Sequence, residues 1–265
     1  MRRAGDQRGR GRAVTVVNGK ERRLRRLIAE DGRTLLVALD HSVTTGVVGG
    51  LTNMGSVMRS VVSGGADGIV AHRGSAAREM PVQRDTAMIV HLSGNTALSP
   101  QSELKATVCE PETAAAMGAD AVSAHITLGC GHREDRDALV GLGAVARSCD
   151  RLGMPLLVMT YIRTEATDIG PDVLHASRIA AELGADIVKA AHPGEQYLTD
   201  LAAQVPVPVV IAGGGPDGSW DAFLNSAKNA IGAGIAGLCV GRRVFGSVDP
   251  ARATAELRGV VHGSG

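Results

Sequence analysis

Lys189 is the residue of this sequence whose surroundings most favour covalent chemistry. It ends the short run DIVK and precedes two alanines, whereas the other three lysines, Lys20, Lys105 and Lys228, fall in stretches typical of a surface. Burial removes water from an ammonium group and favours the neutral amine, which attacks carbonyl carbon. The sequence therefore indicates a Schiff-base lysine, although a structural lysine that pairs with an acid or extends outward fits the same pattern.

Two further side chains could move protons beside such a lysine. Tyr161 is one of only two tyrosines and ends the run PLLVMTY. Its phenol could serve a carbinolamine or a new hydroxyl, or it could be a core tyrosine with a satisfied hydroxyl. Asp40 ends the run TLLVALD, and an unpaired carboxylate is costly to bury. It could hold a substrate hydroxyl, act as acid or base, or pair with Lys189.

Glycines and an arginine near the end of the chain suit a phosphate group. Gly213, Gly214 and Gly215 follow one apolar run, and Gly241 with Arg242 follows the next. Backbone amides approach an anion closely where no side chain intervenes, and Arg242 adds positive charge.

Several histidines invite the alternative of a metal-dependent aldolase. His41, His72, His91, His125 and His192 all follow or end apolar runs, but no HxH or HxxxH spacing occurs. We expect no metal and no cofactor. The iminium that Lys189 would form with a ketone withdraws electrons from the neighbouring carbon, which is the role of the metal in a metal-dependent aldolase.

Short apolar runs must position these side chains. Their spacing leaves room for a helix between each pair, which is the rhythm of repeated βα units with parallel strands. The triplet Gly-Ala-Asp recurs before three of the runs, where glycine would cap a helix. The predicted strands are 34–40, 67–72, 87–92, 120–125, 155–161, 186–189, 208–212 and 236–241.

Eight such units predict an α/β fold, a single-domain (β/α)8 TIM barrel, whose catalytic residues lie where the strands end. A doubly wound open sheet is the alternative, but its glycine-rich first turn is replaced by Asp40-His41-Ser42. We assign 24–265 to the barrel and 1–23, which is rich in arginine, to a disordered basic segment.

Composition and charge exclude several classes of partner. A formal net charge of +1 gives no field that would attract nucleic acid or a membrane. The four cysteines form no CxxC pair, and no apolar run is long enough to span a bilayer. We expect a cytoplasmic protein with free thiols.

Five segments together resemble the archaeal-type class I (Schiff-base) aldolases, and most closely their aminodideoxyheptulosonate synthase branch. The similarity extends from about residue 24 to 261. The segments are LDHSVTTGVVGGL from Leu39, HLSGNTALSP from His91, MGADAVSAH from Met117, GADIVKAAHPG from Gly184 and LCVGRRVF from Leu238.

The resemblance implies a homo-oligomer, possibly a decamer, and Schiff-base chemistry on a phosphorylated ketose and an aldehyde. It implies Lys189 as the Schiff-base lysine, Tyr161 as proton donor and Asp40 as acid or base. The HLSG-x-T segment implies L-aspartate 4-semialdehyde as acceptor, on the route to an aminohydroxybenzoate or dehydroquinate compound. The residues expected to bind substrate or its phosphate are Gly213, Gly214, Gly241, Arg242, His41, His91, Ser93 and Arg163.

Two departures from the family pattern leave the donor open. Ser42 replaces a glycine after Asp40-His41, and Ile162 and Thr164 replace the proline and glycine that flank the arginine of the Tyr-Pro-Arg-Gly motif. The donor could be dihydroxyacetone phosphate or a deoxyketofructose phosphate. The alternatives are a fructose-bisphosphate aldolase and a phosphosugar-binding or isomerase barrel without carbon–carbon chemistry.

Overall fold

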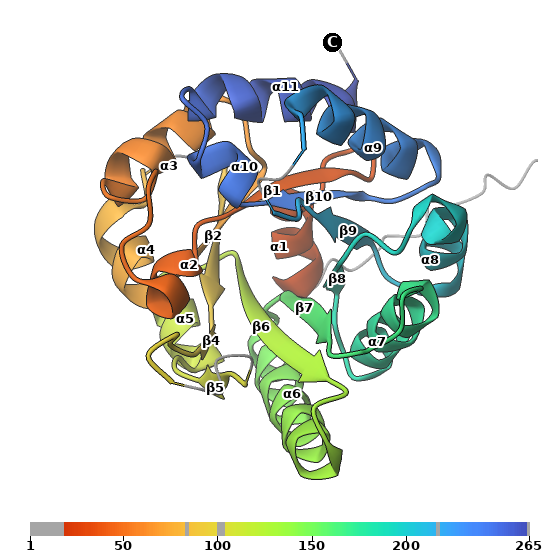
Figure 1. The fold of residues 1–265 in the computed structure, drawn as a ribbon. Helices are drawn as coiled ribbons and strands as arrows, with labels where there is room; N and C mark the ends of the chain where they lie inside the picture. The colour runs from red at the N-terminus through yellow and green to blue at the C-terminus, as the bar shows by residue number, and fades with distance from the viewer. Residues whose placement is uncertain (1–18, 83–84, 100–103, 216–217, 264–265) are drawn as a thin grey trace, which may run out of the picture.

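Eight parallel strands close into a barrel in the order β1-β10-β9-β8-β7-β6-β3-β2 (Figure 1). The computed structural model describes residues 19–82, 85–99, 104–215 and 218–263. All eight predicted strands are present, with ends that differ by a few residues, and the single-domain (β/α)8 prediction is confirmed. The strands are β1 Thr34–Ala38, β2 Gly68–His72, β3 Ala87–His91, β6 Ala121–Leu128, β7 Leu156–Ile162, β8 Ile187–Ala190, β9 Val209–Ala212 and β10 Gly237–Val240.

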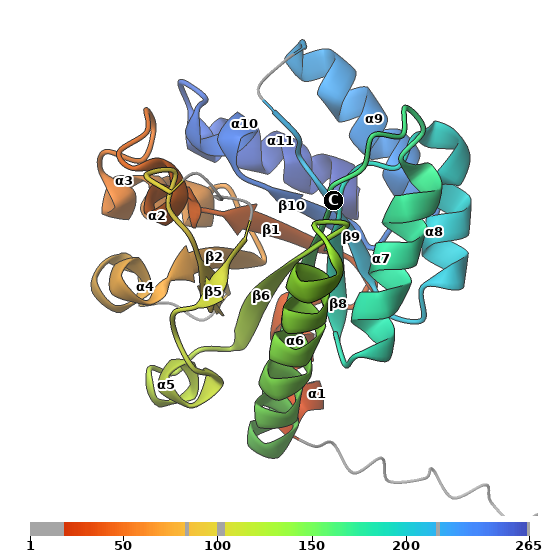
Figure 2. The same cartoon turned by 60° about the horizontal axis from the view of Figure 1, so that its bottom comes forward.

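Helices surround the barrel, and an aliphatic core fills the space between the two layers (Figures 1 and 2). This core contains many valines, leucines and alanines but one buried phenylalanine, as the scarcity of aromatic residues predicts. No helix among the described residues is both long and apolar enough to span a membrane. The helices are α2 His41–Thr45, α3 Met54–Ser63, α4 Arg73–Glu79, α5 Pro111–Ala116, α6 His132–Leu152, α7 Gly170–Glu182, η1 Glu195–Tyr197, α8 Leu198–Gln204, α9 Trp220–Gly232, α10 Arg242–Phe245 and α11 Pro250–His262.

A helix that the sequence did not predict covers the end of the barrel where the strands begin. Helix α1, Gly19–Leu27, is mostly charged, but its Leu24 and Leu27, together with Ile28 just after it, pack against the barrel's interior side chains. Figure 1 looks along the barrel and shows α1 through its centre. Residues 1–18 of the expected disordered segment lie outside the described residues, while residues 19–23 are helical, which differs from the expectation.

A small β-hairpin stands between the third and fourth barrel strands. Its strands are β4 Ser93–Gly94 and β5 Ala106–Thr107, which pair antiparallel, with Ser93 opposite Thr107. The backbone of Val108 also donates to the carbonyl of Leu92 at 2.7 Å. The hairpin thereby returns the chain to the rim of the barrel just after Lys105.

The repeated Gly-Ala-Asp triplet ties neighbouring strands together. Its glycines have positive φ, 83° at Gly65 and 102° at Gly184, as a left-handed helix cap requires. Each aspartate then accepts a hydrogen bond from the backbone N–H at or near the start of the preceding barrel strand. The bonds run from Leu35 to Asp67 at 2.6 Å, from Met88 to Asp120 at 2.9 Å and from Leu156 to Asp186 at 2.9 Å.

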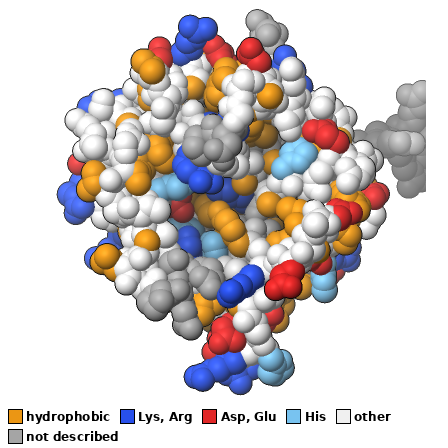
Figure 3. Space-filling view, in the orientation of Figure 1, with side chains coloured by type: hydrophobic (Ala, Val, Ile, Leu, Met, Phe, Trp, Pro, Cys, Tyr) orange, Lys and Arg blue, Asp and Glu red, His pale blue; other side chains and the backbone are white. Residues whose placement is uncertain are grey.

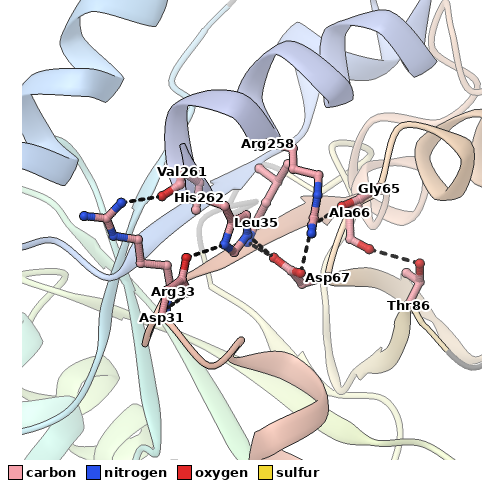
Figure 4. A network of polar contacts seen from close by, with 10 residues as sticks. All are labelled: Asp31, Arg33, Leu35, Gly65, Ala66, Asp67, Thr86, Arg258, Val261 and His262. Carbon is pink, nitrogen blue, oxygen red and sulfur yellow. Dashed lines mark hydrogen bonds and ion pairs between the residues drawn. The ribbon is translucent and has the colours of Figure 1, made fainter. Parts of the chain in front are cut away.

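Asp67 also anchors the last helix. His262 bridges Asp67 and Asp31, with 2.8 Å from a ring nitrogen to each carboxylate, and Arg258 lies 3.2 Å from the Asp67 Oδ1 (Figure 4). The network joins the end of α11 to the beginning of β1 and β2.

Replacing Asp67 with alanine is expected to lower the free energy of unfolding by about 3 kcal/mol, because it removes a charged hydrogen-bond partner from a buried backbone N–H. Leu35, which carries that N–H, is fully buried. Urea denaturation measures the change, with the exposed Asp85→Ala as control. A loss similar to that of the control would contradict this role.

Candidate active site

The alternation of side chains along the strands brings the candidate residues to one end of the barrel. Every second side chain of a barrel strand points inward. Ala38, Met159 and Ile187 belong to the interior cluster. Two residues after these three in the sequence come Asp40, Tyr161 and Lys189, respectively. Their side chains therefore extend the interior layers toward the rim where the strands end.

A cavity of about 810 Å³ opens at this rim. Figure 3 shows a hollow at the centre of this face that holds basic, acidic and histidine side chains close together. Six of the side chains predicted for the site line the cavity, namely Asp40, His41, Tyr161, Arg163, Lys189 and Arg242.

Lys189 lies at the floor of this cavity and is nearly buried, with 7% of its surface exposed. Its strand neighbours in β7 and β9 are Met159 and Val210. The Nζ lies 4.0 Å from the Met159 Sδ. An amine with an apolar floor beneath it and open space above suits attack on a bound carbonyl group.

Asp40 lies close to two histidines. Its Oδ2 lies 3.6 Å from the Nε2 of His91, and its Oδ1 lies 3.5 Å from the Nδ1 of His41. His91 is fully buried, and its Nδ1 pairs with the Ser123 Oγ at 2.8 Å. Burial lowers the pKa of His91 to about 3 despite the nearby Asp40 charge, so His91 is a neutral ring at physiological pH.

The charge states of Asp40 and Lys189 depend on each other. Burial alone would raise the pKa of Asp40, but electrostatic interactions with His91, Lys189, His41 and Lys105, in decreasing order, hold that pKa well below its usual range. Because His91 is neutral near pH 7, Lys189 is the main cation that keeps Asp40 ionised.

Burial alone would lower the pKa of Lys189, but negative charge on Cys239, Tyr161 and Asp40 raises it above its usual value. Thiols and phenols are largely uncharged near pH 7, which leaves Asp40 as the anion. This direction is opposite to the one that burial alone would give, and the neutral amine expected from the sequence stays a prediction.

Tyr161 is held at the edge of the cavity by a histidine. Its ring stacks on His125 with 4.3 Å between centroids, and the His125 Nε2 pairs with the Thr127 Oγ1 at 2.8 Å. The His125 backbone N–H donates to the Ser93 Oγ at 3.0 Å. Tyr161 is 46% exposed, so its hydroxyl can reach a bound molecule.

The predicted phosphate residues divide between two places. Arg242 lines the main cavity, whereas Gly213 and Gly214 line a neighbouring cavity of about 120 Å³. Gly241 lies under His41, where an added Cβ would come 2.5 Å from the His41 Cε1. Arg243 donates from its Nε to the Gly213 carbonyl at 3.0 Å.

His91 and Ser93 do not line the main cavity. His91 lies behind Asp40, and Ser93 lines a second cavity of about 360 Å³ beside the hairpin. Among the described residues, no group of three His, Cys, Asp or Glu side chains could hold a metal ion.

The sequence analysis missed Lys105, which it placed at the surface. Lys105 lines the main cavity together with Asn95, and both come from the segment that contains the β4–β5 hairpin. Burial lowers the pKa of Lys105, an effect that Asp40 opposes and Lys189 reinforces, so the amine lies within electrostatic reach of both. The available signal was that the chain has only four lysines, one of which follows the HLSGNTALSP segment.

Known proteins resemble this chain over most of its length. Residues 34–247 match the model of the DeoC/LacD family aldolases. The 2-amino-3,7-dideoxy-D-threo-hept-6-ulosonate synthase of Halobacterium salinarum is 39% identical over 250 residues, which cover 92% of each chain. The 2-amino-4,5-dihydroxy-6-oxo-7-(phosphonooxy)heptanoate synthase of Streptomyces griseus is 37% identical, with 92% of this chain and 90% of the relative covered.

A solved structure is similar over the same extent. An archaeal fructose-1,6-bisphosphate aldolase, with its catalytic lysine covalently bound to the carbinolamine intermediate of its substrate, matches with a TM-score of 0.81 and 26% identity. The match covers 92% of this chain and all of the other. The chain therefore belongs to the DeoC/LacD family of aldolases.

Proposed function

We propose that this enzyme is a class I aldolase in which Lys189 forms a Schiff base with a phosphorylated ketone and joins it to L-aspartate 4-semialdehyde. The observation that carries the proposal is a nearly buried amine at the floor of an 810 Å³ cavity that Asp40 and Tyr161 also line. The product is an amino-heptulosonate-type precursor of an aromatic compound.

The reaction begins when Lys189 loses one proton, for which ionised Asp40 is the acceptor. The nitrogen then attacks the ketone carbon, and the carbonyl oxygen takes the proton that this nitrogen loses, which gives a carbinolamine. Tyr161 protonates that hydroxyl so that it leaves as water, and the C=N bond forms.

Carbon–carbon bond formation follows from the iminium. Tyr161, which gave up its proton in the dehydration, removes a proton from the carbon next to the iminium, and the resulting enamine attacks the aldehyde carbon. The aldehyde oxygen takes this proton from Tyr161 and becomes the new hydroxyl. Water then hydrolyses the iminium, which releases the product and restores the amine.

The relatives' names support one acceptor and two donors. Cleaving the compound in the Streptomyces name between C4 and C5 gives dihydroxyacetone phosphate and aspartate 4-semialdehyde. The same cleavage of the compound in the Halobacterium name gives hydroxyacetone and the same aldehyde. A deoxyketofructose phosphate would supply the hydroxyacetone unit after the enzyme has cleaved it on Lys189.

Product analysis with two donors tests the proposal. The enzyme is incubated with aspartate 4-semialdehyde and either dihydroxyacetone phosphate or the deoxyketofructose phosphate, and products are detected by mass. A seven-carbon amino acid from either donor is the expected result, and it identifies the donor. Cleavage of fructose 1,6-bisphosphate without any such product would instead support a fructose-bisphosphate aldolase.

Replacing Tyr161 with phenylalanine is expected to lower kcat by about 100-fold to 10,000-fold, because proton transfer to the departing hydroxyl is lost. The KM of the donor should change little. Steady-state kinetics measure both, and Tyr197→Phe is the matched control, since this second tyrosine contacts Asp168 rather than the cavity. Equal losses in the two variants would contradict the role of Tyr161.

A cytoplasmic location and assembly into a homo-oligomer, both expected from the sequence, stay predictions.

A further inference from the structure

One side of the main cavity contains an amine that the mechanism above does not use. Lys105 lines the main cavity from the position just before β5. It also lines the second cavity of about 360 Å³, so it stands between the two. No ion pair or hydrogen bond joins its amine to another described residue.

Asn95 presents a second unsatisfied donor to the same cavity. The Thr44 hydroxyl lies 2.7 Å from the Asn95 Oδ1 and donates to it, which assigns that atom as the acceptor end of the amide. The Asn95 Nδ2 is buried and has no hydrogen-bond partner in the described part of the chain. Buried donors are normally paired, so an unpaired amide N–H beside a cavity indicates a ligand acceptor.

The order of the barrel separates these two donors from the arginine. In the closed order of strands, β3 lies diametrically opposite β9, and β6 lies opposite β10. Arg242 follows β10, whereas Asn95 and Lys105 follow β3 and share the cavity wall with His125 and Thr127 of β6. Lys189, on β8, lies between the two sides. A substrate joined to Lys189 therefore meets positive charge at both ends.

We propose that Lys105, with the Asn95 amide, binds the carboxylate of the acceptor aldehyde while the donor phosphate lies toward Arg242. The inference rests on the proposed function and assigns the group that selects the acceptor. An ammonium and an amide N–H match the two oxygens of a carboxylate. A bound carboxylate would also offset the cost of burying the Lys105 charge.

The same assignment accounts for the orientation of the aldehyde. Holding the carboxylate at the β3 side directs the aldehyde carbon back toward the centre of the barrel, where the enamine on Lys189 forms. Lys105 is thus a positioning residue that acts on the acceptor and not on the donor.

Lys105→Met tests the proposal against three aldehydes. Aspartate 4-semialdehyde carries both a carboxylate and an ammonium, succinate semialdehyde keeps only the carboxylate, and 3-aminopropanal keeps only the ammonium. The kcat/KM of the variant is expected to fall about 10-fold to 100-fold with the two aldehydes that carry a carboxylate. Its kcat/KM with 3-aminopropanal should change little. Lys105→Arg should restore part of the loss, and Lys228→Met, at an exposed position, is the matched control.

A binding measurement tests the same contact without relying on the turnover of the two analogue aldehydes. Homoserine, the alcohol that corresponds to aspartate semialdehyde, should lose potency as an inhibitor of Lys105→Met by a similar factor. Equal losses with all three aldehydes, or unchanged inhibition by homoserine, would overturn the proposal, as would a rise in the donor KM alone.

Failure of this inference is distinguishable from failure of the proposed function. Borohydride trapping of the donor on Lys189 uses no aldehyde, so it should be the same in Lys105→Met as in the unaltered enzyme. Trapping that is intact while aldehyde selectivity is unchanged would reject only the role of Lys105.

Discussion

Replacing Lys189 with methionine is expected to lower kcat/KM by about 10,000-fold or more, because the nucleophile that carries every covalent intermediate is removed. Methionine has a similar length and no charge, so it fills the same space beside Met159 and Cys239. Steady-state kinetics with the donor identified above measure the loss. Lys228→Met, which makes the same change at an exposed position, should retain full activity.

Stability separates this loss from misfolding. Lys189 is nearly buried, and its removal leaves buried Asp40 without the cation that lowers its pKa, which destabilises the fold. The thermal unfolding midpoint of Lys189→Met should therefore fall, while its far-ultraviolet circular dichroism at the assay temperature stays that of the unaltered enzyme. A variant that folds and keeps more than about 1% of kcat/KM would be inconsistent with covalent catalysis by this lysine.

Replacing Asp40 with asparagine is expected to lower kcat by about 100-fold to 10,000-fold, because the ionised proton acceptor beside Lys189 is lost. The substitution should also shift the pH dependence of Schiff-base formation on Lys189. The negative charge on Asp40 helps to raise the pKa of Lys189, while burial lowers it. Without that charge the effect of burial is less opposed, so the pKa of Lys189 must fall.

The direction of the shift in the pKa of Lys189 can be measured by borohydride trapping. A lower pKa means that the neutral amine appears at lower pH, so the rate at which borohydride traps the donor should rise at lower pH in Asp40→Asn than in the unaltered enzyme. Asp85→Asn, at an exposed position, is the control. An unchanged or upward shift, with kcat close to normal, would show that Asp40 neither pairs with Lys189 nor transfers its proton.

Most of the fold could be predicted because local patterns decide it. Runs of Val, Ile, Leu and Ala mark the strands, and Gly-Ala-Asp precedes three of them. The structure explains why the triplet marks the strand so well, since Asp67, Asp120 and Asp186 each accept a backbone hydrogen bond from a neighbouring strand. The triplet supplies both the glycine that ends a helix and the aspartate that binds the neighbouring strand. It can therefore be recognised in the sequence without tertiary information.

The sequence did not predict helix α1 as a barrel cover. Its residues are mostly Lys, Arg and Glu, and only Leu24 and Leu27, together with Ile28 just after the helix, form the apolar face that meets the barrel. Several of the charges have partners on other elements. Lys20, for example, lies 2.8 Å from Asp150 and 3.1 Å from Asp186.

Within the site, the position of a side chain on a barrel strand was predictable and its charge was not. Asp40, Tyr161 and Lys189 end apolar runs, so their place at the rim follows from the period of a strand. The pKa of Lys189 is raised by Cys239, Tyr161 and Asp40, which all lie far from it in the sequence. Lys105 was missed for a related reason, because the β4–β5 hairpin and not a barrel strand brings it to the cavity.

Peptide mapping after borohydride reduction tests the central claim most directly. The enzyme is incubated with the ketose phosphate alone, reduced, digested and analysed by mass. The cavity offers two amines, Lys189 and Lys105, so the position of the adduct is informative. We expect the mass of the reduced donor on the peptide that contains Lys189 and none on Lys105. An adduct on Lys105, or no adduct from an enzyme that turns over the same donor, would contradict the account.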